Sequence, residues 1–181
     1  MSTFKNLLIY SISIIALFSL TAISCDDIGD IELPDITAPM DIEKTYVIDT
    51  SEAAYFAKYE TIDPAEDLAE YKDRIKSAEI EKISAEITEL LDGNSAITDG
   101  LFIIYDISQG VPVKVFEYDL PDFSKVSETI EIPIDSEAKE FLKNAVENDE
   151  KFDVGFDIFV TGPSHYQVDV TFHGVITASA E

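Results

Sequence analysis

Beyond residue 40, apolar positions in this chain mostly alternate with polar ones, a spacing of two that is typical of β-strands with one buried face. The run from Leu101 to Ile107 is apolar on both faces, which indicates a central strand. Turn-forming residues separate these segments. The pattern therefore predicts eight strands, at residues 44–50, 55–62, 77–91, 101–107, 111–120, 130–134, 154–160 and 166–176.

Two short helices are predicted between the strands. Asp63-Pro64 offers an N-cap followed by proline at the first helical position, and we expect that helix to run through Leu68, Tyr71 and Ile75. The second helix begins with Ser136 as its cap, and its apolar positions form a single stripe. They are Ala138, Phe141, Leu142, Ala145 and Val146.

Residues 77–91 fit two periods. Ile80, Ile83, Ile87 and Leu90 recur at helical spacing, so one helix could continue from Pro64 into this segment. Ile83, Ala85 and Ile87 also alternate as a strand would, which requires a bulge near Ile80. Periodicity alone leaves both alternatives open.

Turn signals define how the later strands connect. Gln109-Gly110 is predicted to be a two-residue connection, and Pro112, which cannot donate a ladder hydrogen bond, indicates an edge or a bulge. The last two strands are predicted to form a hairpin through Gly162-Pro163-Ser164-His165. The fold expected for residues 41–181 is mainly β, a single antiparallel β-sandwich of about eight strands, with the two helices covering an open end or edge.

Residues 1–24 have the three parts of a secretory signal peptide. Lys5 supplies the basic start, an apolar run extends from Leu7 to Leu20, and the small residues Ala22 and Ser24 precede Cys25. A transmembrane anchor needs about 20 predominantly apolar residues. This run, interrupted by serines, barely reaches that length.

The stretch Ala22-Ile23-Ser24-Cys25, followed by Asp26 and Asp27, resembles the lipobox of bacterial lipoproteins. The resemblance implies cleavage between Ser24 and Cys25 and acyl chains such as palmitate on Cys25, which anchor the chain to a membrane. Two or more acyl chains make such an anchor stable. The acidic residues 25–40 then form a tether. Acids after the cysteine also resemble the surface-export signal of Bacteroidota lipoproteins, which implies the outer membrane, on its periplasmic face or at the cell surface.

The segment from Glu70 to Ile80, with Ile75-Lys76-Ser77 inside it, is similar to part of an uncharacterised group of Bacteroidota cell-envelope lipoproteins. The ending Val170-Thr171-Phe172 and Ile176-Thr177-Ala178 is similar to the same group. In that group a long β-strand follows the Ile-Lys-Ser stretch, so the resemblance favours a strand for residues 77–91. It implies no activity.

Charge and cysteine content restrict the partners. The sequence carries 12 Lys and Arg against 37 Asp and Glu, a net charge of −25; the leader removes one lysine and no acid, which leaves −26 on the 157 residues after it. Nucleic acid and anionic membrane surfaces are therefore poor partners, and we expect no nucleic-acid binding, because binding to polyanions depends on Lys and Arg. With the single cysteine lipidated, no thiol remains for a disulfide or a zinc cluster.

Catalytic and metal-binding motifs are not found. His165 and His173 lack neighbours at metal-ligand spacing, Asp169 lies too far from His173 to pair, and Ser164 beside His165 has no nucleophile elbow around it. The loops at residues 92–94 and 98–100 have the composition of turns rather than of calcium sites. We therefore expect no cofactor, no metal, no catalytic residue and no enzymatic activity.

One short predicted strand carries aromatic residues on both of its faces, namely Tyr55, Phe56 and Tyr59. They are either core residues or a platform for a ligand such as a glycan or a peptide. The function expected is that of a non-enzymatic, membrane-anchored cell-envelope lipoprotein with a binding or structural role and an unknown protein or glycan partner. Alternatives are a β-sandwich module that binds a small apolar ligand or a glycan, and a divergent hydrolase using Ser164 or His165.

Overall fold

The computed structural model describes residues 34–92, 97–121 and 129–180, without the side chains of residues 89–99. The predicted leader, Cys25 and most of the predicted tether lie outside the described residues. The side chains of residues 92–94 and 98–99, which belong to the candidate calcium loops, also lie outside them.

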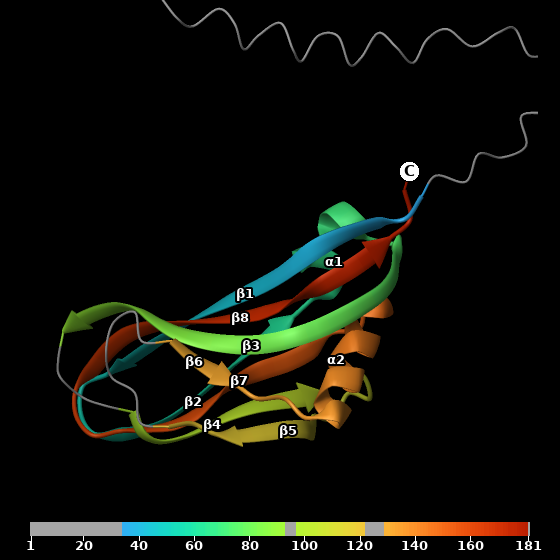
Figure 1. Ribbon diagram of the computed structural model, residues 1–181. Coiled ribbons are helices and arrows are strands. Elements are labelled where there is room, and N and C mark those ends of the chain that lie inside the picture. Colours follow the sequence, from blue (N-terminus) through green and yellow to red (C-terminus); the bar gives the residue numbers. More distant parts are fainter. Residues whose placement is uncertain (1–33, 93–96, 122–128, 181) are drawn as a thin grey trace, which may run out of the picture. The chain divides into compact units, whose positions relative to one another are not determined.

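Eight strands form two four-stranded antiparallel sheets, so the protein is mainly β and has the predicted sandwich architecture (Figure 1). Sheet A has the order β1 (Ile36–Thr50), β8 (Ser164–Ala178), β3 (Ile75–Asp92) and β6 (Thr129–Ile132). Sheet B has the order β2 (Ala54–Ile62), β7 (Phe152–Val160), β4 (Ile97–Asp106) and β5 (Val113–Asp119). As predicted, β4 is a central strand with buried residues on both faces, Phe102 and Ile104 on one and Ile103 on the other.

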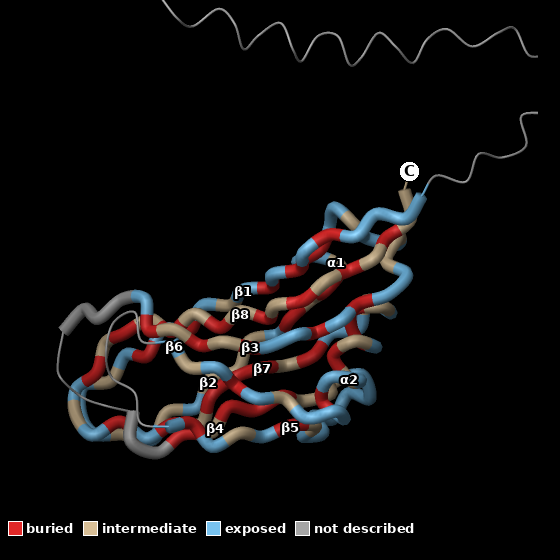
Figure 2. Tube along the Cα trace, viewed as in Figure 1, coloured by how far each residue is buried: buried red, intermediate tan, exposed pale blue. Residues whose placement is uncertain are grey.

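The core lies between the inner faces of the two sheets. Along β8 every second residue is buried, and the same alternation runs along β1, as Figure 2 shows. Aromatic rings from both sheets meet edge to face; the centroid of Tyr46 lies 5.0 Å from that of Phe156, and Phe152 lies 6.0 Å from Phe172. Each fully buried side chain of this kind contributes about 1.5–3 kcal/mol, so the alternation of the sequence directly selects the inward face.

The hairpin predicted for the last two strands is wrong. β7 belongs to sheet B and β8 to sheet A, so the chain crosses between the sheets after Val160. β1 and β2 divide in the same way, with β1 paired to β8 and β2 paired to β7. One antiparallel ribbon therefore bends across both sheets. Alternation of apolar and polar residues predicts which face of a strand is buried. It does not show whether the next strand pairs with it in the same sheet or continues in the other sheet.

Residues 77–91 lie in β3, so the strand prediction is confirmed. A register shift between Ile80 and Lys82 places a bulge where the strand interpretation requires one. The preceding helix is shorter than predicted: α1 (Pro64–Asp67) is followed by the 3₁₀ helix η2 (Ala69–Tyr71), and Ile75 already begins β3. Asp73 adopts a positive φ of 62° just before that strand, which ends the helical turn.

Helix α2 (Ser136–Glu147) covers the edge of sheet A that β6 leaves open (Figure 1). β6 pairs only with residues 83–86 of β3. Beyond it, the Glu147 carboxylate accepts a hydrogen bond from the backbone N–H of Ala78 at 2.9 Å. The predicted cap is off by one residue, because Asp135, not Ser136, accepts a hydrogen bond from the N–H of Ala138 at 2.8 Å. The helix thus protects an exposed strand edge.

The start of β1 and the connection between β4 and β5 differ from prediction. β1 begins at Ile36, inside the range assigned to the tether, because Ala38 and Met40 continue the buried alternation while Pro39 faces outward on an edge strand. The connection between β4 and β5 spans residues 107–112 rather than two residues, and Gly110 takes a φ of +74° in it. Pro112 precedes β5, which is an edge strand as expected.

Candidate functional site

The outer face of sheet B carries a group of aromatic side chains, Tyr55 and Tyr59 from β2, Tyr105 from β4 and Phe159 from β7, which we call the aromatic face. Tyr55 and Phe159 lie directly opposite each other in the β2–β7 register. They are 65 % and 41 % exposed. The other exposed large apolar residues of the described chain are Ile36, Val47, Val111 and Val113, none of which lies opposite another in a strand pair. An adjacent pair of this kind marks a binding surface more strongly than scattered apolar residues do.

The ring of Tyr59 packs over Gly155 of the neighbouring strand. Gly155 lies opposite Tyr59 on β7, and a Cβ added at Gly155 would meet the Tyr59 ring at 2.7 Å. The ring centroid of Tyr59 lies 5.4 Å from that of Tyr105 in an edge-to-face arrangement. Ile103, on the other side of Gly155, is only 3 % exposed although it belongs to the outer face. The aromatic face therefore has a small packed base, which keeps its rings in defined positions.

A carboxylate lies within the same face. The Tyr59 hydroxyl donates a hydrogen bond to Asp157 Oδ1 at 2.6 Å. Burial, and then the hydrogen bonds to Asp157 and Tyr105, raise the pKa of Tyr59 well above its ordinary value, so the phenol remains a donor. The Asp157 carboxylate, which lies across from Ala57 and Leu101, keeps further acceptor capacity for a ligand.

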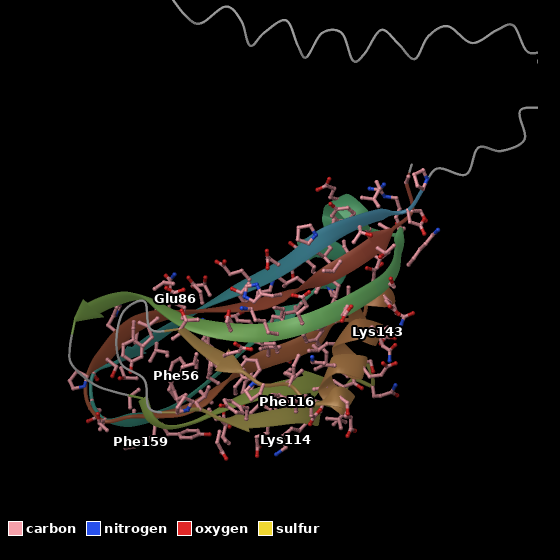
Figure 3. All side chains as sticks on the ribbon, viewed as in Figure 1. Phe56, Glu86, Lys114, Phe116, Lys143 and Phe159 are labelled. Atoms are coloured by element: carbon pink, nitrogen blue, oxygen red, sulfur yellow. The ribbon has the colours of Figure 1, made fainter. Side chains whose placement is uncertain are left out.

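The predicted platform of Tyr55, Phe56 and Tyr59 divides between two faces. Tyr55 and Tyr59 point outward, whereas Phe56 is half-buried and packs against the core. Figure 3 shows Phe56 in the space between the sheets and Phe159 at the lower margin of the molecule. Sequence reasoning missed Phe159 and Tyr105. The sequence of β7 contained a signal for Phe159, because it alternates in step with Asp153 and Asp157, whose charges favour the outer face.

The outer face of sheet A is polar, and it brings together three side chains that the sequence keeps far apart. His173 Nδ1 lies 2.7 Å from Asp41 Oδ1, and His173 Nε2 lies 2.9 Å from Ser84 Oγ. His173 was predicted to point outward from the last strand, and it lies on the outer face of sheet A, where both of its ring nitrogens have a hydrogen-bond partner. Asp169 instead accepts a hydrogen bond from Thr45 at 2.7 Å.

Ser164 and His165, adjacent in sequence, point to opposite faces of β8. Ser164 is 2 % exposed, and its hydroxyl donates to the carbonyl of Gly162 at 2.8 Å. His165 Nδ1 lies 3.3 Å from Asp49 Oδ1 on the outer face. The two side chains therefore do not form a nucleophile and its base.

Two grooves lie beside α2. One, of about 340 Å³, is lined by Ser77, Ala78, Glu79, Lys143, Val175 and Thr177. A neighbouring one has about 200 Å³. Within residues 34–92, 97–121 and 129–180, no three His, Cys, Asp or Glu side chains are grouped as metal ligands, and neither helix has the length and apolar content to cross a membrane.

The chain matches no protein-family model and no curated protein sequence. Among solved structures it is similar to one of Desmodium yellow mottle tymovirus, with a TM-score of 0.40 and 10 % identity over 90 % of this chain and 97 % of the other. A structure of turnip yellow mosaic virus gives a TM-score of 0.39 and 11 % identity over 90 % and 92 % of the two chains. At these scores the similarity bears on neither family nor function.

Proposed function

We propose that this protein is a membrane-anchored lipoprotein of the cell envelope that binds a neutral glycan through the aromatic face, a role that involves no chemical step. The anchor is the acylated Cys25 at the end of the Ala22-Ile23-Ser24-Cys25 stretch. Lipid is needed because the chain after the leader, with 11 Lys and Arg against 37 Asp and Glu and so a formal charge of −26, has little attraction to an anionic membrane.

The observation that carries the binding role is the pair of exposed rings, Tyr55 and Phe159, beside the carboxylate of Asp157. Sugar rings present C–H faces that pack on aromatic rings, and their hydroxyl groups donate hydrogen bonds to carboxylates. The excess of acidic residues opposes polyanionic ligands, which favours an uncharged polysaccharide. The packed base under Tyr59 reduces the entropy lost when a ligand binds.

The test is affinity electrophoresis of the mature chain, carrying Cys25→Ala to remove the lipid, through gels that contain neutral cell-envelope polysaccharides. We expect retardation by at least one polysaccharide, and an affinity about tenfold or more weaker for Tyr55→Ala and for Phe159→Ala. Val47→Ala is the matched control, because Val47 is 44 % exposed on the outer face of sheet A. Equal retardation of all three variants, or none for the unsubstituted face, would contradict the proposal.

A further inference from the structure

Three strands of sheet A contribute one line of side chains across its outer face: Asp41 from β1, His173 from β8 and Ser84 from β3. We propose that this line is a nucleophilic serine site that hydrolyses small acyl esters. This activity goes beyond the glycan-binding role. The serine site lies on sheet A, whereas the aromatic face lies on sheet B.

The geometry gives each side chain a role. In the tautomer with the proton on Nδ1, His173 donates to Asp41 at 2.7 Å, and its free Nε2 accepts from the Ser84 hydroxyl at 2.9 Å. Both distances lie within the range of about 2.6–3.2 Å in which a base can accept the proton of a nucleophile. Asp41 is the positioning residue, since it fixes the tautomer and stabilises the imidazolium that forms.

A solvated polar sheet face also forms cross-strand pairs without chemistry, and the molecule contains such a pair. His165 and Asp49 lie opposite each other on the same two strands, eight residues from His173 and Asp41 along each strand. There the nitrogen–oxygen distance is 3.3 Å, and the neighbouring hydroxyl of Ser164 is directed to the carbonyl of Gly162. What distinguishes the His173 site is the third partner, a serine hydroxyl on the second ring nitrogen.

The surroundings of Ser84 suit a small substrate. Lys82 lies directly opposite His173 and two residues before Ser84, so its positive charge is on the same face. Asp41 and His173 have 65 % and 30 % of their side chains exposed. The site is therefore an open surface, which favours a short acyl group presented on a larger alcohol.

The reaction balances with water as the co-substrate. Ser84 Oγ attacks the carbonyl carbon of the ester while its proton passes to His173 Nε2, and the bond from that carbon to the alkoxy oxygen then breaks. The alcohol leaves with the proton from His173. A water molecule, deprotonated by His173, attacks the acyl-serine, and the carboxylic acid and the free Ser84 hydroxyl are released. An ammonium group at Lys82 favours the oxyanion formed in both steps.

The experiment is covalent labelling of the intact mature chain with a biotinylated fluorophosphonate, followed by peptide mass spectrometry, together with hydrolysis of 4-nitrophenyl acetate. We expect the label on Ser84, and loss of both labelling and hydrolysis in Ser84→Ala. His173→Gln should lower the labelling rate by about 100-fold or more, since positioned bases contribute about 10²–10⁴-fold. Asp41→Asn should also lower the rate and alter its pH profile.

His165→Gln is the matched control and should label at the rate of the unsubstituted chain. All these side chains are solvent-facing, so thermal unfolding is expected to be nearly unchanged, which separates loss of chemistry from loss of fold. Absence of label on Ser84, or equal labelling rates in His173→Gln and His165→Gln, would overturn the proposal. Because the aromatic face is not touched by these variants, glycan binding would be unaffected by either outcome.

Discussion

Replacing Gly155 by alanine tests how the aromatic face is built. Gly155 is buried in β7 opposite Tyr59, with ordinary strand geometry on both sides. An added Cβ would lie 2.0 Å from the carbonyl oxygen of Lys58 and 2.7 Å from Cα of Tyr59. Both are backbone atoms, so no side-chain rotation relieves the overlap. Strand β2 has to move away from β7, and the Tyr59 ring has to leave its place over Gly155.

The expected cost follows from overpacking. An added methyl group that forces backbone shifts costs about 1–3 kcal/mol, and the two backbone contacts place Gly155→Ala in the upper part of that range. For a domain of this size that corresponds to a Tm lower by about 4–10 °C. Displacement of Tyr59 should also break its hydrogen bond to Asp157 and weaken glycan binding.

Thermal unfolding followed by circular dichroism gives the stability, and polysaccharide affinity gives the second readout. Gly110→Ala is the comparison, because nothing lies within 4 Å of a Cβ there and only its φ of +74° opposes the substitution. Its expected cost is about 1 kcal/mol. If Gly155→Ala were as stable as the parent chain and bound glycan equally well, the close β2–β7 approach under Tyr59 would be refuted.

Three further predictions test particular contacts. Tyr46→Phe removes a buried hydroxyl that donates to a β7 carbonyl at 2.8 Å, and chemical denaturation should show a loss of about 1 kcal/mol. Asp135→Ala removes the N-cap of α2 and should cost about 1 kcal/mol by the same method, whereas Ser136→Ala should change stability by less than about 0.5 kcal/mol. The hydrogen bond from the Lys151 ammonium lowers the pKa of Asp63, so this pair stabilises the fold above the ordinary aspartate pKa and that contribution disappears as pH falls through the lowered value. NMR titration should show the Asp63 midpoint rising in Lys151→Met, and an unchanged midpoint would contradict this assignment.

The fold class could be predicted because each strand of a sandwich has one buried face, which makes apolar and polar residues alternate within that strand alone. The alternation in residues 166–176 is the alternation of buried positions in β8, and the bulge after Ile80 is implied by the phase of Ile83, Ala85 and Ile87. Pairing is different. The corner between β7 and β8 could not be predicted, since strand partners depend on contacts between the two sheets that no local pattern records.

The two outer faces show the same limit. Tyr55 and Tyr59 were recognised from one segment, but Phe159 reaches them only through the β2–β7 register. The site around His173 is more distant still, since Ser84 and Asp41 lie 89 and 132 residues away in the sequence. Adjacency in sequence instead suggested Ser164 and His165, which alternate to opposite faces of a strand. Alternation along a strand places sequence neighbours on opposite faces, and strand pairing brings residues that are far apart in the sequence onto the same face.

The two faces divide the proposed roles of the domain. Sheet B offers flat rings and a carboxylate for a neutral glycan, and sheet A offers Ser84, His173 and Asp41 for ester cleavage. The sequence alone predicted a protein without enzymatic activity. The labelling of Ser84 decides whether that expectation holds.

Metabolic labelling of the full-length chain with an alkyne fatty acid tests whether this domain is displayed on a membrane through Cys25. We expect the unsubstituted chain to be labelled and to fractionate with the cell envelope, whereas Cys25→Ala should be neither labelled nor retained there. Equal labelling of the two chains would contradict the lipoprotein assignment.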